Sequence, residues 1–325
     1  MIVAEIVRNG RNGHDPWRPR VKRDGSRPVV ELGGREIRSM TREVVDVETI
    51  LAGQERLGID RVLLSPWVPL LYPEAEPESC LERCRIQNEA LEGLVRATPD
   101  RIAALGAVPL QAPELAAAEL GSLAAAGVLS GVEVTASVGG TYIGDPRFEP
   151  FWAVAERTRA VILVHPTTRG FDDPVFGRHY LWNAVGNPFE TTIAAAEMTM
   201  AGVLERHPGL RVILAHGGGA LLALRGRLRH AHEVRPDARS DLTESPLDSI
   251  RRFYFDTVTH DRDLLRALID WAGADRVLLG SDYPFDMADP APVDTVRALG
   301  LEGDVEEAVL GGNAERLLVR STVDA

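Results

Sequence analysis

Short runs that are apolar at nearly every position alternate along this chain with longer stretches whose apolar residues recur every three or four positions. A nearly continuous apolar run is typical of a strand buried on both faces, as in a parallel sheet covered by helices. Seven such runs occur, at residues 61–68, 102–110, 131–137, 160–166, 211–218, 253–259 and 276–284. The pattern therefore predicts a parallel sheet with seven strands.

Helical spacing of apolar residues fills most of the gaps between these runs. It predicts helices at residues 81–99, 114–127, 148–158, 190–208 and 261–273. Strand and helix alternate without a linker, a repeat or a change in composition, so residues 1–325 form one domain. Repeated βα units in one chain indicate an α/β fold of the (β/α)8 TIM barrel type.

A closed barrel of this type needs eight strands, and the first run begins only after about 60 residues. That opening segment predicts a helix at 2–9, a polar insertion rich in Gly, Pro and Arg around 10–38, and a helix at 42–57. We expect the missing first strand to lie before Met1, which leaves the barrel open. The alternative is that residues 27–32 supply it, although the two glycines that follow favour a surface hairpin.

Composition and charge narrow the function classes. The chain is 45% hydrophobic and 26% charged, which is ordinary globular usage, and its net charge is −12. Such a surface repels phosphate backbones and argues against a nucleic acid partner, but it permits a small acidic substrate. No apolar run is long enough to span a membrane, and Glu5 interrupts the opening apolar stretch, so we expect a cytoplasmic protein.

The two cysteines, Cys80 and Cys84, lie four residues apart in a predicted helix. Two thiols do not make a disulfide framework, and no further cysteine completes a metal site. We interpret them as partly buried helix residues.

Three of the predicted strands end in a polar residue. His165 closes the fourth strand, His216 the fifth and Asp282 the seventh. Carboxyl ends of barrel strands meet at one mouth, where catalytic groups of such barrels sit. Imidazole and carboxylate are ligands of catalytic zinc and similar ions. Glycines 217–219 allow either close approach to a ligand or a tight turn. The pattern predicts one divalent metal site at the mouth.

Six segments together resemble the amidohydrolase-2 family. They read VHP, LAHGGGALLALRGRL, FYFDT, VLLGSDYPF, GNPFETTIA and LGGNAERLL. The likeness extends from about residue 17 to 318. Within the family the chain is most similar to the aminocarboxymuconate-semialdehyde decarboxylase group, which also contains decarboxylases of hydroxylated aromatic acids.

The resemblance implies roles for the three strand-end residues. His165 and Asp282 match metal ligands, and Asp282 also matches a proton relay. His216 matches the histidine that acts as general acid and base. The resemblance implies one divalent metal ion, zinc first and manganese as the alternative, because these ligand types suit both.

The resemblance also implies roles for three arginines. Arg38 falls where the family places an arginine on the substrate carboxylate. Arg227 and Arg235 match arginines that reach the neighbouring subunit's site, which implies a homodimer. Trp182 and Asn183 are candidates for shaping the substrate pocket. The small-molecule partner is therefore expected to be a carboxylate.

One family motif has no counterpart in this sequence. The family opens with a strand that ends in His-x-His, and both histidines bind the metal. His14 is the only histidine before His165, and it has no partner two residues away. The pair His230 and His232 follows a helical stretch and is interpreted as part of a helix face. We expect that the natural chain begins earlier; the alternative is a relic that has lost its metal.

Three functions remain open at this point. The first is a metal-dependent carbon–carbon lyase that decarboxylates a small unsaturated or aromatic acid. The second is a metal-dependent hydrolase of an amide, lactone or ester, since fold and ligands serve both reactions. The third is a metal-free relic that only binds small molecules. The arginines favour an acidic substrate and decarboxylation.

Overall fold

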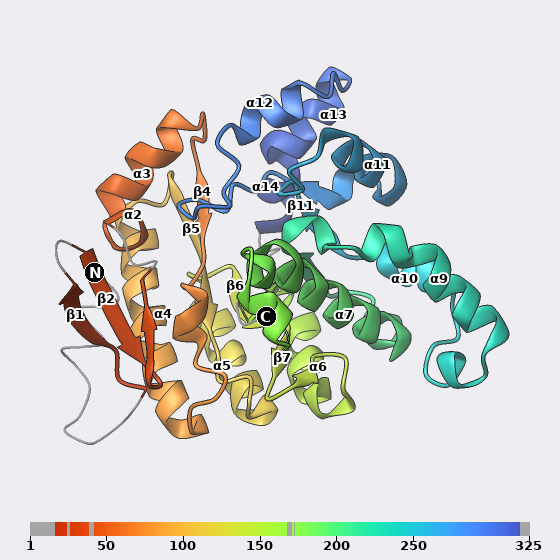
Figure 1. The fold of residues 1–325 in the computed structure, drawn as a ribbon, viewed down its shortest axis with the longest axis horizontal. Coiled ribbons are helices and arrows are strands. Elements are labelled where there is room, and N and C mark those ends of the chain that lie inside the picture. The colour runs from red at the N-terminus through yellow and green to blue at the C-terminus, as the bar shows by residue number, and fades with distance from the viewer. Residues whose placement is uncertain (1–16, 25–26, 39–41, 168–170, 172, 319–325) are drawn as a thin grey trace.

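The centre of the molecule is a parallel sheet with seven strands (Figure 1). The computed structural model describes residues 17–24, 27–38, 42–167, 171 and 173–318. The strands, in spatial order, are β12 (Val277–Leu278), β11 (Tyr254–Asp256), β10 (Arg211–Leu214), β9 (Val161–His165), β6 (Gly131–Thr135), β5 (Ile102–Ala107) and β4 (Val62–Leu64). All seven predicted strands are confirmed, each in parallel register with its neighbours.

All seven strands are shorter than their apolar runs. The run at 61–68 pairs only over Val62–Leu64, since Pro66 lacks the N–H group that a ladder requires. The run at 276–284 pairs only over Val277–Leu278, because Gly280 bonds the Thr257 hydroxyl through both its N–H and its carbonyl. The remaining apolar residues continue into loops at the mouth.

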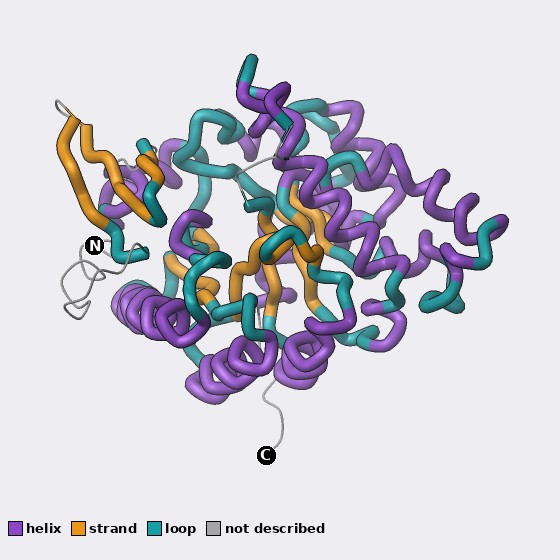
Figure 2. Tube along the Cα trace, turned by 60° about the horizontal axis from the view of Figure 1, so that its bottom comes forward, coloured by secondary structure: helices purple, strands orange, loops and turns teal. Residues whose placement is uncertain are grey.

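Helices surround the strands, as Figure 2 shows. They are α4 (Pro77–Ala97), α5 (Pro113–Ala126), α6 (Glu149–Thr158), α7 (Asn187–Met200), α8 (Val203–Arg206), α9 (Leu221–Val234), α10 (Pro246–Ile250), α11 (Arg262–Ala272), α12 (Pro292–Arg297), α13 (Gly303–Glu307) and α14 (Asn313–Leu318). The helix predicted at 190–208 is divided between α7 and α8, because Gly202 adopts a left-handed backbone with φ of 68°. None of the helices in these residues combines the length and apolar character needed to cross a membrane.

A separate antiparallel sheet precedes the barrel. Its strands are β1 (Arg20–Asp24), β2 (Arg27–Leu32) and β3 (Arg35–Ile37). Val30 and Leu32 pack in one cluster with Cys80 and Cys84 of α4. The surface hairpin expected for residues 27–32 is confirmed, and these residues are not a barrel strand. The helix expected at 2–9, and His14, lie outside the described residues.

The segment between this small sheet and β4 forms two helices. The single helix expected at 42–57 is instead α2 (Arg42–Val45) and α3 (Val47–Arg56). Asp46 separates them with an extended backbone, and its carboxylate caps α3 by accepting the N–H of Thr49 at 3.2 Å. A side chain that caps the second helix ends the first one.

The cysteines are buried deeper than the sequence suggested. Cys80 and Cys84 are both fully buried in α4, with their sulfur atoms 3.8 Å apart and no disulfide between them. Their place in the small apolar cluster confirms a packing role.

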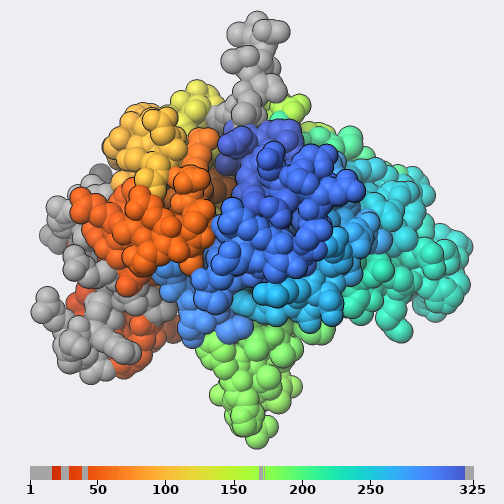
Figure 3. Space-filling model, turned by 90° about the horizontal axis from the view of Figure 1, so that it is seen from above, coloured from red at the N-terminus to blue at the C-terminus, as the bar shows by residue number. Residues whose placement is uncertain are grey.

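The sheet curls without closing. Within the described residues, β12 and β4 are its two ends and do not pair with each other. Figure 3 shows the segment before β4 in orange beside the C-terminal helices in blue. For the described residues, the expected open barrel is confirmed.

Candidate active site

The polar residues at the ends of β9, β10 and β12 converge at one point. His165, His216 and Asp282 each offer a ligand atom, and these atoms lie within 4.8 Å of one another. The two imidazole rings meet edge to face, with centroids 5.1 Å apart. The parallel strands bring together residues that span 117 positions of the sequence, from His165 to Asp282. The sequence prediction that these three side chains share one mouth is therefore confirmed.

Unusual backbone conformations aim two of these side chains into the mouth. His216 and Asp282 have φ of 57° and 53°, in the left-handed region that side chains other than glycine rarely adopt. Gly219 follows at φ of 64°, and a Cβ there would lie 2.0 Å from the carbonyl oxygen of Pro188. The glycines after His216 thus serve a tight turn against α7. Left-handed residues at a cluster of this kind often mark functional sites.

Asp256, at the end of β11, holds the turn in place. Its carboxylate accepts the N–H of His216 at 2.9 Å, of Gly217 at 2.7 Å and of Val258 at 3.0 Å. Charge-assisted bonds to several backbone N–H groups are strong and directional. Asp256 therefore fixes the position of the His216 backbone.

We expect Asp256→Asn to lower the free energy of unfolding by about 1–3 kcal/mol, because its amide nitrogen would face backbone N–H donors and leave one buried donor unpaired. Urea unfolding measures this change. The matched control is Asp270→Asn, on an exposed position of α11, where a shift within about 0.5 kcal/mol is expected. Equal stability of both variants would show that Asp256 does not hold the turn.

Burial keeps both imidazoles neutral. Burial, together with the nearby His216, lowers the pKa of His165 to about 3. Burial also lowers the pKa of His216 to about 4, with His260 adding to the effect. His165 donates its Nδ1 proton to the carbonyl of Pro166 at 2.9 Å, which leaves Nε2 as the free lone pair. Neutral imidazole is the form that binds a metal ion.

Two carboxyl groups near the mouth have raised pKa values. Burial, together with the negative charges of Asp256 and Asp286, raises the pKa of Asp282 to about 7. Burial raises the pKa of Glu133 on β6 to about 8; a hydrogen bond with Ser65 opposes the shift, and Asp282 adds to it. Clustered, perturbed groups in a cavity are typical of catalytic sites.

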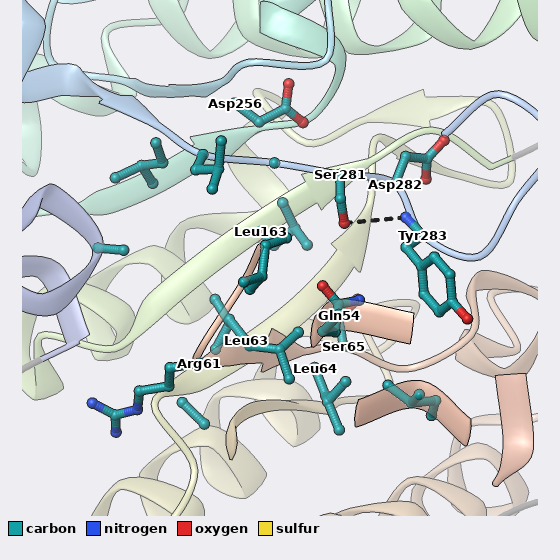
Figure 4. A pocket seen from close by; sticks show the side chains of 18 of the residues that line it. Gln54, Arg61, Leu63, Leu64, Ser65, Leu163, Asp256, Ser281, Asp282 and Tyr283 are labelled. Carbon is teal, nitrogen blue, oxygen red and sulfur yellow. Dashed lines mark hydrogen bonds between the residues drawn. The ribbon is translucent and has the colours of Figure 1, made fainter. Parts of the chain in front are cut away.

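A cavity of about 610 Å³ connects this cluster to the open side of the barrel. Its wall includes the three clustered residues, Asp256 and Glu133, and apolar side chains from both ends of the sheet. Figure 4 shows Asp256, Asp282 and Tyr283 in this wall, with Gln54 and Ser65 close by. The volume suits a small molecule of drug-like or smaller size.

The predicted substrate arginines lie away from this cavity wall. Arg38, on the exposed end of the small sheet, forms an ion pair with Glu36 at 2.8 Å. Arg227 and Arg235 are exposed on and just after α9, and Arg235 pairs with Asp237 at 3.0 Å. His230 and His232 also lie on α9, which confirms the helix interpretation.

Trp182 and Asn183 lie in a π-helical turn, Trp182–Gly186, just before α7. Both are half-buried, and neither belongs to the cavity wall. The ring of Trp182 packs edge to face against Tyr180, whose hydroxyl donates to Asp286 at 2.8 Å. Tyr180, just before the turn, thus links Trp182 to the loop that carries Asp282.

Sequence reasoning missed Asp256, Glu133 and Gln54. Asp256 closes the apolar run FYFDT, so the rule that found Asp282 also applies to it. Glu133 is a single charged residue within the predicted strand GVEVTAS, which is a weaker signal. Gln54 has no signal at all, since a glutamine on a helix is most often exposed.

Comparison with known proteins shows which family this chain is similar to. The model of the amidohydrolase family Amidohydro_2 matches residues 74–320. A 2-amino-3-carboxymuconate-6-semialdehyde decarboxylase of Dictyostelium discoideum is 29% identical over 290 residues, which cover 88% of this chain and 80% of that protein.

Two solved structures share the fold. The apo form of Metarhizium anisopliae IDCase superimposes with a TM-score of 0.81 at 25% identity, and covers 96% of this chain and 93% of its own. The 5-carboxyvanillate decarboxylase LigW of Sphingomonas paucimobilis gives a TM-score of 0.75 at 29% identity over 82% of this chain and 81% of its own. With about three quarters of its length matched by the family model, the chain belongs to the amidohydrolase family.

Proposed function

We propose that this protein is a metal-dependent decarboxylase, a carbon–carbon lyase, acting on a small aromatic or unsaturated carboxylate. The observation that carries the proposal is the convergence of His165, His216 and Asp282 in one cavity. The names of its relatives support the reaction, since the Dictyostelium protein and LigW are both decarboxylases of carboxylated substrates. Nothing in the cavity favours hydrolysis over this reaction.

The donor set fits one divalent ion. His165 and Asp282 would hold it, with a neutral imidazole and a carboxylate as ligands, and these suit zinc or manganese. Such an ion, when bound, supplies a Lewis acid that polarises oxygen atoms of the substrate. The free Nε2 of His165 and the left-handed backbone at Asp282 orient both ligands toward the same point.

His216 and Asp282 would handle the proton. In a decarboxylation the carbon that bears the carboxylate gains a proton, and the bond to that carboxylate breaks to release CO₂. His216 has a buried Nδ1 with no partner in the described residues, so this ring is free to exchange a proton with a ligand. Asp282 has a carboxylate oxygen within 4.8 Å of a ring nitrogen of His216, so it could pass the proton on.

We expect a homodimer in which exposed arginines complete the site. Arg227 and Arg235 lie outside their own cavity wall and on the surface of the chain, where they could reach a second copy. Trp182 and Asn183 would narrow the entrance beside the loop that carries Asp282.

The proposal is tested by metal titration combined with CO₂ release. Protein stripped with a chelator is loaded with zinc or with manganese, and a panel of carboxylated aromatic compounds is assayed. We expect weak metal binding that reaches about one ion per chain only at high metal concentration, because the His-x-His ligands have no counterpart in this sequence, and CO₂ release that depends on the metal. Asp282→Asn should weaken metal binding at least about tenfold, since it removes one charged ligand. Asp270→Asn is the matched control and should bind metal normally.

Two results would contradict the proposal. Hydrolysis of a lactone or amide without CO₂ release from any acid would replace it with a hydrolase. Absence of metal binding at any concentration tested would favour a protein that has lost its metal and only binds small molecules.

A further inference from the structure

Three buried oxygen atoms in the cavity wall have no hydrogen-bond partner in the described residues. They are Oε1 of Gln54 from α3, Oε2 of Glu133 from β6, and the hydroxyl of Tyr283 from the loop after β12. Buried polar atoms without partners are uncommon, and each one calls for a physical explanation. Three of them around one cavity point to a ligand that supplies the missing bonds.

The three oxygens lie on the same side of the cavity, next to the catalytic cluster. The Tyr283 hydroxyl lies against α3, since a Cβ on Gly53 would come within 2.2 Å of it, and Gln54 is the next residue. Ser65, at the end of β4, hydrogen-bonds Glu133. Figure 4 shows Gln54, Ser65 and Tyr283 gathered below Asp282.

The chemistry of these atoms selects one kind of ligand group. The amide oxygen of Gln54 only accepts hydrogen bonds, and Glu133 adds a carboxyl oxygen. Glu133 is protonated near neutral pH and can accept or donate, so the atom that requires a donor from the ligand is Oε1 of Gln54. A group that donates, such as a hydroxyl or an amino group, satisfies Gln54 Oε1, and the Tyr283 hydroxyl can donate in return.

We propose that Gln54, Glu133 and Tyr283 form a polar subsite that binds a hydrogen-bond-donating substituent, hydroxyl or amino, on the ring of the substrate. The subsite would select among aromatic acids, while His165, His216 and Asp282 act on the carboxylate. This inference rests on the proposed function only in taking the ligand to be an aromatic carboxylate.

Binding of matched ring pairs tests the subsite without turnover. The probes are the 2-, 3- and 4-isomers of hydroxybenzoate, each paired with the fluorobenzoate of the same position, which has similar size but no donor. Isothermal titration of the purified protein should show one hydroxyl isomer binding about tenfold tighter than its fluoro partner, the effect of one good hydrogen bond. An aminobenzoate of the same position should share the preference.

Two variants and a control assign the preference to the subsite. Gln54→Met keeps the side-chain length but removes the acceptor, and Tyr283→Phe removes the hydroxyl; each should reduce the tenfold preference to about threefold or less. Tyr72→Phe removes a tyrosine hydroxyl that is equally buried but outside the cavity wall, and should leave the preference unchanged. Thermal melting checks that each variant folds, and the two variants probe the subsite independently.

The outcomes separate this inference from the decarboxylase proposal. Equal binding of hydroxyl and fluoro probes at all three positions overturns the subsite, as does a preference that neither variant reduces. A hydroxyl preference lost in the variants, in a protein that releases no CO₂ from any acid, keeps the subsite and overturns the decarboxylase. CO₂ release without a hydroxyl preference supports the decarboxylase and overturns the subsite.

Discussion

His216→Asn is expected to lower kcat for CO₂ release by about 10²–10⁴-fold, the usual contribution of a positioned general acid or base. The imidazole of His216 lies in the cavity wall 5.1 Å from that of His165, measured between ring centroids, and its Nδ1 has no partner in the described residues. Asparagine keeps a polar side chain of similar reach but cannot exchange a proton near neutral pH. The backbone bond from residue 216 to Asp256 does not depend on the side chain and should persist.

The same variant decides whether His216 is a proton carrier or a third metal ligand. If His216 only moves protons, metal content per chain should stay the same while kcat falls. A parallel loss of metal would instead show that His216 holds the ion together with His165 and Asp282. His230→Asn, on the exposed face of α9, is the matched control and should leave both quantities unchanged.

The sequence analysis took polar residues that close an apolar run as candidates for the site. This worked for His165, His216 and Asp282 because barrel topology places the carboxyl ends of all parallel strands at one mouth. His165 and Asp282 each follow an apolar run, and the run itself shows where the strand leaves the core. The same apolar runs overestimate the lengths of the strands. Near Asp282, for example, apolar residues continue along the mouth although strand pairing ends at Leu278. Local pattern therefore predicts which residues reach the site better than it predicts where pairing stops.

The cavity wall could not be predicted from local pattern. Gln54 reaches it only because α3 lies beside the loop after β12, a contact between segments more than two hundred residues apart. Glu133 occupies an inward position of β6, where a single polar residue in an apolar run gives no sign of what it faces. The exposed positions of Arg227 and Arg235 also depend on how α9 packs, which spacing alone does not reveal.

Glu133→Gln is expected to change how stability depends on pH. Burial raises the pKa of Glu133 from 4.5 to about 8 in the folded protein, whereas the unfolded chain titrates near 4.5. Between these values the folded state holds a proton that the unfolded state has released. The stability that this carboxyl contributes is therefore complete below pH 4.5 and is lost as pH rises through about 8. Glutamine has the same shape and cannot ionise, so the stability of the variant should not show this loss as pH rises.

Urea unfolding at pH 5, 7 and 8.5 measures the difference between the two proteins. The unfolding free energy of the wild type should fall relative to that of Glu133→Gln by a few kcal/mol between pH 5 and pH 8.5, on the order expected for a shift of this size. Glu302→Gln, at an exposed position, should keep the pH dependence of the wild type. A difference between wild type and Glu133→Gln that stays constant with pH would mean that Glu133 ionises normally in the folded cavity. Glu133 would then add a negative charge beside Asp282 at neutral pH, which would favour a cation over a neutral donor in this part of the cavity.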